Sequence, residues 1–476
     1  MIGTPQGMVY VISDDQVLRV EQNGSTQTII DASRLHSPYR IAYVAKSNQL
    51  LIAERGDSHV VKRFDIATGK LLRTYGRAGG RLGGVFIKTD FLNICDVADD
   101  GHGGFIVQEG GHGALRRTVR MDAQGKHVRT WYGSPQFFNY ACPDPADPSR
   151  IFYRSDEGSK TLAQMDLKTG QWEVLEDYPH TDFDGMFPSP GHYSVRWQVH
   201  RRGDELYLFG NSGRVWGVVR VDRQAGKLVP LASAGVWNKY HKEGMSPLLA
   251  QALKADGQDP VKLKDHVFYS WSDRNADGQL TVEEVRIAKQ PQTMTPIGWQ
   301  VYTDENWNMR LTTLDGWLTL PNANAQSSTD IPDWDIQALT QTTGWDITKH
   351  ERPDAWRACG IMADQEGNVY QSLEGQAHPN WDRPAAGWPT VDSGSSRMIK
   401  RRADGSMAWV VGKHAVASPG STIYQMHQPG EFHDLRDILG IVNLGGVNDC
   451  VLFGDRVVRP VVAYTQDGLY AGSIFD

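Results

Sequence analysis

The stretch Lys62-Arg-Phe-Asp-Ile-Ala-Thr-Gly69 combines a short strand pattern with a tight-turn signal. Glycine reaches a positive φ without strain, and the aspartate before it can cap the turn through its own side chain, so a β-hairpin is predicted here. Similar stretches recur along the chain, with turn glycines at positions 24, 69, 125, 170, 226 and 405. The first five lie 45, 56, 45 and 56 residues apart, a period typical of one four-stranded repeat.

Further short strands with turns between them precede these hairpins, as at 40–44 and 49–54 or 197–200 and 205–210. Four antiparallel strands in each repeat predict an all-β chain folded as a β-propeller. We expect residues 1–476 to form a single propeller of seven blades, or eight if the strands within 461–475 form a blade of their own. We expect the C-terminal strands to close the ring against the N-terminal ones, which removes open sheet edges. A β-sandwich or two stacked β-domains is the alternative.

The repeats resemble NHL-type β-propeller blades over about residues 6–235 and 355–412. The resemblance implies the fold rather than the chemistry, because propellers of this kind host unrelated functions. Less regular segments interrupt the repeats: a partly helical insertion is expected at 236–296, and long loops at 321–356 and 376–396.

Composition excludes several classes of protein. The chain has 49 Lys plus Arg against 56 Asp plus Glu, a net charge of −7 and no long basic stretch, so nucleic acid is not expected as a partner. No window approaches 18 apolar residues, so no membrane span is expected. The N-terminus lacks the basic and apolar regions of a secretory signal, which indicates an intracellular protein or a trimmed chain. The four cysteines form no CxxC motif, so free thiols or one disulfide are expected.

The segment Asp273-Arg-Asn-Ala-Asp-Gly-Gln-Leu-Thr-Val-Glu-Glu284 matches the calcium-loop pattern. It resembles a single EF-hand or dockerin-type loop, with Gly278 at the sharp turn. Calcium prefers six to eight oxygen ligands, which these positions can supply. The predicted ligands of Ca²⁺ are Asp273, Asn275, Asp277, Gln279, Thr281 and Glu284.

This loop departs from the sensor type of calcium site. The entering segment 266–271 has a strand pattern rather than a helical one, and no second loop is present to pair with it. We therefore expect a structural calcium site that pins the 236–296 insertion to the propeller. Loops with few carboxylates often suit high calcium, which favours an extracellular or periplasmic location.

Polar side chains end the second strand of five repeats, at Glu54, Glu109, Asp156, Asn211 and Glu374. Loops at strand ends share one face of a propeller, so these side chains are expected to converge on a rim or channel. His200, on a predicted innermost strand, would face that channel. Carboxylates with His and Arg could act as acid and base on a sugar or uronide, although turn caps and structural histidines are the alternative. The candidate catalytic residues are Glu54, Glu109, His112, Arg196, His200, Asn211 and Glu374.

Tryptophans cluster in the segment where no regular blade is legible, at Trp334, Trp345, Trp356, Trp381 and Trp388. An indole ring on a loop can stack against a sugar face, and it can equally anchor a long loop. Both roles remain open from the sequence.

Three functions follow as hypotheses. The first is a carbohydrate-active propeller that binds, and cleaves by elimination or hydrolysis, an oligosaccharide or polysaccharide. The second is a metal-dependent lactonase of the gluconolactonase type, with Glu54, Asn211 and Glu374 as metal ligands by resemblance. The third is a non-catalytic binding scaffold. No Gly-x-Ser-x-Gly elbow, P-loop or dinucleotide fingerprint in context is present, which disfavours serine hydrolase, kinase and Rossmann chemistry.

Overall fold

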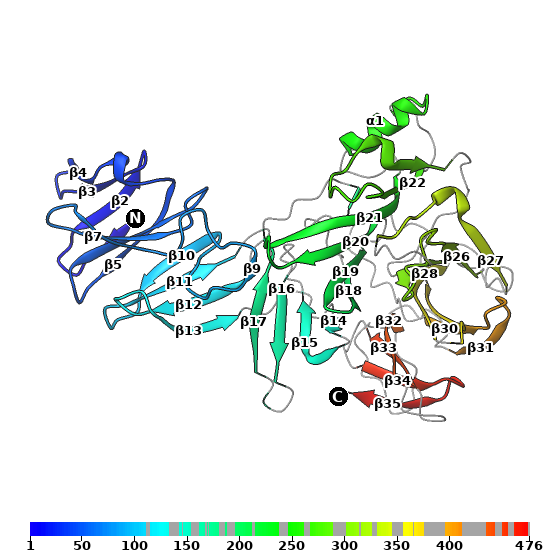
Figure 1. The fold of residues 1–476 in the computed structure, drawn as a ribbon. Coiled ribbons are helices and arrows are strands. Elements are labelled where there is room, and N and C mark those ends of the chain that lie inside the picture. The colour runs from blue at the N-terminus through cyan, green and yellow to red at the C-terminus, as the bar shows by residue number, and fades with distance from the viewer. Residues whose placement is uncertain are drawn as a thin grey trace, which may run out of the picture.

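The computed structural model describes residues 1–110, 115–132, 142–144, 146–153, 161–166, 169, 171–179, 186–187, 196–211, 215–237, 246–260, 267–288, 301–313, 316–325, 331–344, 356–364, 366–375, 396–411, 435–442, 450–455 and 461–474. These residues form eight antiparallel sheets, which follow one another along the sequence (Figure 1). None of their helices is long and apolar enough to cross a membrane.

Each of the first four sheets is built mainly from strands that are consecutive in the chain. The first contains β1 (Ile2–Gly3), β2 (Val9–Ser13), β3 (Gln16–Val20) and β4 (Thr26–Ile30). The second contains β5 (Pro38–Val44), β6 (Gln49–Glu54), β7 (Val61–Asp65) and β8 (Leu71–Tyr75). The third contains β10 (Ile94–Asp99), β11 (Phe105–Glu109), β12 (Arg117–Met121) and β13 (His127–Tyr132). The fourth contains β14 (Cys142–Asp144), β15 (Asp147–Tyr153), β16 (Thr161–Met165), β17 (Trp172–Asp177) and the added strand β9 (Gly84–Val85).

The last four sheets continue this order, and the fifth is the widest. The fifth contains β18 (Arg196–Arg202), β19 (Glu205–Asn211), β20 (Val215–Asp222), β21 (Lys227–Trp237), β22 (Val267–Ser272) and β23 (Val285–Ile287). The sixth contains β24 (Val301–Thr303), β25 (Met309–Thr312), β26 (Gly316–Leu320) and β27 (Thr340–Thr343). The seventh contains β28 (Trp356–Ala363), β29 (Val369–Gly375), β30 (Ser396–Arg401) and β31 (Met407–Val411). The eighth contains β32 (Leu435–Val442), β33 (Cys450–Asp455), β34 (Val461–Thr465) and β35 (Tyr470–Ile474). The described helices are α1 (Pro247–Ala255) and the short 3₁₀ turns η1 (Ala32–Arg34), η3 (Val282–Glu284) and η4 (Ile336–Ala338).

The first strands of neighbouring sheets lie against one another. β5 contacts β10, β14 contacts β18, and β28 contacts both β24 and β32. Successive four-stranded meanders that meet through their first strands have the radial architecture of a β-propeller. The chain is therefore an all-β protein of the β-propeller class, as the sequence predicts.

The turn glycines serve two purposes. Gly24, Gly69, Gly125, Gly226 and Gly405 all have positive φ, between +62° and +89°, whereas residue 170 lies outside the described part. Several of these turns also press against the preceding sheet: a Cβ on Gly69 would collide with the carbonyl oxygen of Ile29, and one on Gly405 with the Thr343 carbonyl. These turns therefore need glycine for close packing between sheets as well as for backbone conformation.

Outer strands also donate hydrogen bonds to the turn of the next sheet. The hydroxyl of Tyr75 on β8 donates to the carbonyl of Ala123 at 2.9 Å, and the indole nitrogen of Trp409 on β31 donates to the carbonyl of Gln466 at 2.7 Å. Both acceptor carbonyls lie two residues before the glycine of their turn, Gly125 and Gly468. Contacts between neighbouring sheets therefore recur along the chain, as the strands within each sheet do.

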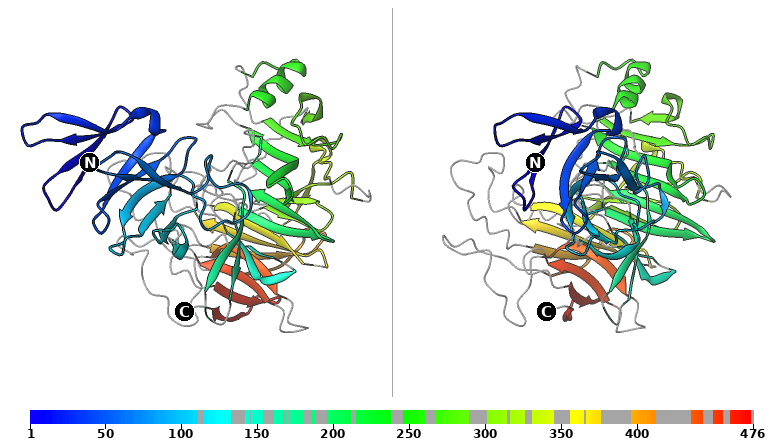
Figure 2. Two further views of the ribbon diagram at one scale, coloured as in Figure 1. Left: turned by 60° about the vertical axis from the view of Figure 1, so that its left-hand side comes forward. Right: turned by 90° about the vertical axis from the view of Figure 1, so that its left-hand side faces the viewer.

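The described sheets bear on the blade count, and two other expectations, about ring closure and one loop, need correction. The structure has eight described sheets, which matches the alternative of eight rather than seven, because the C-terminal strands form a sheet of their own. This sheet shares no described strand with β1–β4, and Figures 1 and 2 show the two chain ends lying apart, so the expected closure between the termini is not observed. The 321–356 segment is not simply a long loop, since it contributes η4 and β27. The segment 376–395 lies outside the described residues.

The 236–296 insertion is joined to the fifth sheet. β22 pairs with β21 from Ala232↔Ser272 to Trp237↔Val267, and β23 pairs back onto β22. Helix α1 packs on β23 and η3, with Leu249 and Leu253 buried in the same core cluster as Trp271. The predicted strand before the calcium loop is therefore β22, and the loop connects two paired strands.

Candidate functional site

Glu109, at the end of β11, is fully buried between two arginines. Its Oε2 lies 3.0 Å from Arg81 Nη1 and 2.8 Å from Arg117 Nε, and its Oε1 accepts a hydrogen bond from the Leu92 amide at 3.0 Å. Burial alone would raise the pKa of Glu109, but Arg117 and Arg81 outweigh it and hold the pKa below its ordinary value. Glu109 is thus an ionised partner of two cations, and it is poorly suited to act as a general acid.

Glu54, at the end of β6, is also fully buried and paired. Lys62 Nζ lies 2.8 Å from Glu54 Oε1, which also accepts the amide of His36 at 2.8 Å. The hydroxyl of Ser58 donates to Oε2 at 2.6 Å. The carboxylate therefore ties its own strand end to β7 and to the connection from the first sheet.

His200 on β18 lies against the sixth sheet. Its ring centroid is 4.5 Å from that of Trp307, and its Nε2 is 3.3 Å from the hydroxyl of Thr303. Burial, followed by the positive charge of Arg202, lowers the pKa of His200 to about 4, although Asp304 opposes the shift. A neutral histidine packed between two sheets matches the structural alternative.

The remaining candidates are placed only in part. Asn211 ends β19, is buried, and is the register partner of Arg196 on β18; Glu374 lies on β29 opposite Arg357. The side chains of Arg196 and Glu374, and the whole of His112, lie outside the described residues. In the part of the chain that is described, no hydrogen bond or ion pair joins Glu54, Glu109 and His200 to one another.

The calcium-type loop is closed by hydrogen bonds from its own backbone. Asp273 accepts the amides of Asp277 and Gly278, each at 3.0 Å, and Gly278 has a φ of +69°. Glu284 Oε1 accepts the Arg274 amide at 2.8 Å, while its Oε2 accepts the Thr281 hydroxyl at 2.9 Å. The first and last positions of the motif thus lie on one compact loop, with both carboxylates buried.

The donor set suits calcium, although its oxygens are engaged with the loop itself. Burial raises the pKa of Asp273; the amides of Gly278 and Asp277 oppose that rise, and the charges of Glu284 and Asp277 add to it. A cation would relieve this repulsion. Among the described residues, however, no three acidic, His or Cys side chains converge closely enough to form a metal cluster. Any calcium held here would also need the amide, hydroxyl and backbone oxygens of Asn275, Thr281 and Gln279.

The sequence interpretation missed the segment 81–90, here called the strap, which follows the second sheet. Its Gly84 and Val85 form β9 and pair with Asp177 and Glu176 on the outer edge of β17. The strap also carries Arg81, whose partners lie in two different sheets. A single arginine in an irregular loop has no repeat signal, so nothing local marks it as an organising residue.

Among the described tryptophans of the irregular segment, Trp334 is an anchor. It is 1% exposed, and its indole nitrogen donates to the carbonyl of Trp307 at 2.8 Å. It cannot offer its face to a sugar in this structure. The side chains of Trp345, Trp356, Trp381 and Trp388 lie outside the described residues.

No protein-family model matches the sequence, and no curated protein is similar enough to count as a match. Solved structures resemble the chain only distantly. PorZ, a surface component of the type-IX secretion system of Porphyromonas gingivalis, is 10% identical with a TM-score of 0.32, over 94% of this chain and 77% of that one. The Cps50 (Swd1) β-propeller domain of Myceliophteria thermophila is 10% identical with a TM-score of 0.28, over 90% and 97%. A gluconolactonase from Xanthomonas campestris is 19% identical with a TM-score of 0.21, over 47% and 71%. The assignment to the β-propeller class rests on the sheets themselves.

Proposed function

We propose that this chain is a non-catalytic β-propeller scaffold that binds a carbohydrate, and that calcium held by the 273–284 loop stabilises its fifth sheet. The observation that carries the scaffold proposal is the pairing of Glu109 with Arg81 and Arg117, at 3.0 and 2.8 Å. Catalysis by this carboxylate would require an ion pair to break in the buried interior, which is costly. Glu54 is held in the same way by Lys62.

Cleavage of a glycan or hydrolysis of a lactone is the competing proposal. We expect no turnover of a panel of uronides, neutral polysaccharides and aldonolactones by the purified chain, assayed with and without added divalent metals. Release of an unsaturated product that absorbs in the ultraviolet, of new reducing ends, or of acid from a lactone would contradict the scaffold proposal. A catalytic metal bound in addition to calcium would favour the lactonase.

The calcium proposal is supported by the order of oxygen donors around Gly278 and by the two buried carboxylates of Asp273 and Glu284. Calcium at one hundred times its Kd should stabilise the native state by about 2.7 kcal/mol, and hence raise the melting temperature. Asp273→Ala should abolish that increase. Glu283→Ala is the matched control, because Glu283 is an exposed acidic neighbour that the motif does not use as a ligand. An equal response to magnesium, or no response in the unaltered chain, would contradict a calcium site.

We further propose an extracellular or periplasmic location, because a loop with few carboxylates suits the higher calcium found outside the cytosol. Calcium affinity measured by titration tests this directly. A dissociation constant far below the micromolar range would favour a cytosolic role.

A further inference from the structure

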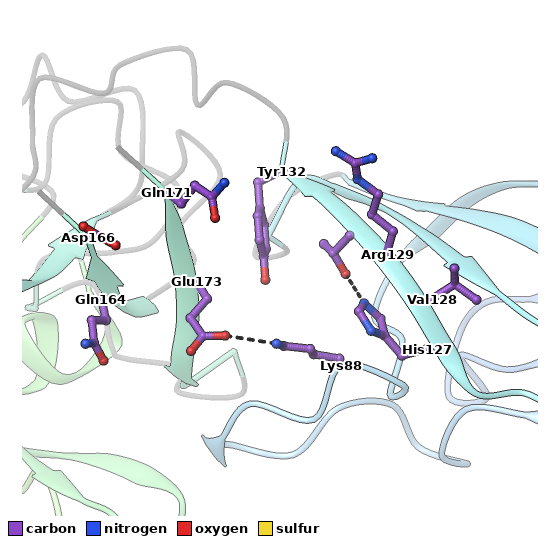
Figure 3. Close-up of a pocket in the computed structure, with 10 residues that line it drawn as sticks. Lys88, His127, Val128, Arg129, Tyr132, Gln164, Asp166, Gln171 and Glu173 are labelled. Carbon is purple, nitrogen blue, oxygen red and sulfur yellow. Dashed lines mark hydrogen bonds and ion pairs between the residues drawn. The ribbon is translucent and has the colours of Figure 1, made fainter. Parts of the chain in front are cut away.

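A polar groove of about 450 Å³ lies between the outer strand of the third sheet and the outer strands of the fourth (Figure 3). One wall is β13 from His127 to Tyr132, and the other contains Gln164, Gln171 and Glu173. This volume is within the range of ligand sites, which is about 300–1,000 Å³. None of the candidate catalytic side chains that the structure describes lines the groove.

Contacts from the strap and within β13 border the groove. Lys88 Nζ on the strap lies 3.0 Å from Glu173 Oε2, and His127 Nε2 lies 2.8 Å from the hydroxyl of Thr130. Tyr132 stands between the two walls in Figure 3, and it packs on the cluster that contains Phe86. This packing fixes the position of the Tyr132 ring.

The charges that line the groove cancel. Lys88 and Arg129 are balanced by Asp166 and Glu173, and burial, Lys88 and Arg117 lower the pKa of His127, which leaves it neutral near pH 7. A polyanion would need an excess of cations, which this lining lacks. The exposed amides of Gln164 and Gln171 each offer both donors and acceptors, as a ligand rich in hydroxyl groups requires.

We infer that this groove binds a short stretch of a neutral oligosaccharide. This rests on the proposed carbohydrate scaffold and locates its binding site away from the rim. A peptide strand is the other conceivable occupant, because β13 pairs only with β12 in the described residues and its second edge is open. Added strands, however, gain their specificity from pockets for alternate side chains, whereas amides and charges line this groove.

The test is titration calorimetry of the full chain with cello-, xylo-, manno-, malto- and laminari-hexaose. At least one should bind, and the double variant Gln164→Ala/Gln171→Ala should weaken that binding at least tenfold. Gln124→Ala, an exposed glutamine in the turn before β13, is the control and should bind as the unaltered chain does. All variants should keep the same melting temperature.

Three results would overturn the inference. They are a lack of binding to every hexaose by the folded chain, binding that the double variant leaves unchanged, and preferential binding of heparin or of an extended peptide at the groove. The calcium response, measured on the same samples, reports on the 273–284 loop alone. Its presence without hexaose binding would reject the groove and leave the calcium proposal intact.

Discussion

Arg81 donates from Nε to Asp177 Oδ2 at 3.0 Å, and so joins the strap to a strand that is 96 residues away in the sequence. Its Nη1 is 3.0 Å from Glu109 Oε2, and the ring of Phe86 lies 4.9 Å from the guanidinium carbon. One buried cation thus connects the third sheet, the fourth sheet and the strap. Because both carboxylates are buried, each depends on this cation for compensation of its charge.

Arg81→Ala should therefore destabilise the chain by about 3–5 kcal/mol, because it leaves two buried carboxylates with incomplete compensation. Urea unfolding, followed by tryptophan fluorescence, measures the change. Arg77→Ala is the control: Arg77 is 51% exposed and its Nε lies 3.4 Å from Asp90, so its loss should cost about 1 kcal/mol or less. Equal losses for the two variants would show that burial of Arg81 does not govern its contribution.

The strap also packs against the turn between β20 and β21 of the fifth sheet. A Cβ on Gly226 would collide with the carbonyl oxygen of Gly83, and the φ of Gly226 is +65°. Gly226→Ala should cost about 3 kcal/mol of unfolding free energy, from backbone strain plus overpacking. Gly203→Ala isolates the first component, because Gly203 has a φ of +57° with open space around it, and it should cost about 1 kcal/mol. Similar unfolding midpoints for the two variants would contradict close packing of the strap.

The sequence predicts the parts of this fold that depend on residues close together in the chain. A hairpin glycine such as Gly69 leaves a signal because positive φ excludes most side chains, and Asp65 caps its turn by accepting the Thr68 amide at 2.8 Å. The strap has no such sequence signal, because its pairing with β17 depends on residues far away in the chain. Only the last strands of the eighth sheet are predicted from the sequence, since 461–475 has a clear strand pattern but the earlier strands of that sheet do not.

The candidate site residues are likewise predicted only in part from the sequence. The order of donors from Asp273 to Glu284 is a local pattern, and these residues lie on one compact loop in the structure. The position of Glu109 at a strand end can also be predicted from the sequence. Its pairing with Arg81 cannot, because that contact forms only when the strap folds back. Position at a strand end therefore predicts where a carboxylate lies, and only the tertiary partners decide whether it is available for chemistry.

A second buried network joins the sixth and seventh sheets through Gln371, which is fully buried. Its Nε2 donates to the carbonyl of Gly316 at 2.7 Å, and its Oε1 accepts from Arg401 Nε at 2.6 Å. Gln371→Leu should cost about 3 kcal/mol, because it removes an acceptor from a buried guanidinium. Gln27→Leu, on the exposed strand β4, should change the unfolding free energy by less than about 0.5 kcal/mol. Equal costs would show that the network is not a main link between these sheets.

The interface between the fifth and sixth sheets should make stability depend on pH. Because the pKa of His200 is about 4 in the folded chain and about 6.5 when unfolded, the unfolded chain binds more protons between these values. Stability from this residue is fully present above pH 6.5 and is lost as the pH falls towards 4, by up to about 3 kcal/mol. His200→Gln keeps a hydrogen-bonding side chain near Thr303 but does not titrate. It should therefore reduce the pH dependence of the urea unfolding midpoint between pH 7 and 4.5. His102→Gln, at an exposed site, should leave the slope unchanged. An unaltered slope in His200→Gln would mean that the acid sensitivity arises elsewhere, since Arg202 and Asp304, the charges that act on the pKa of His200, stay in place in that variant.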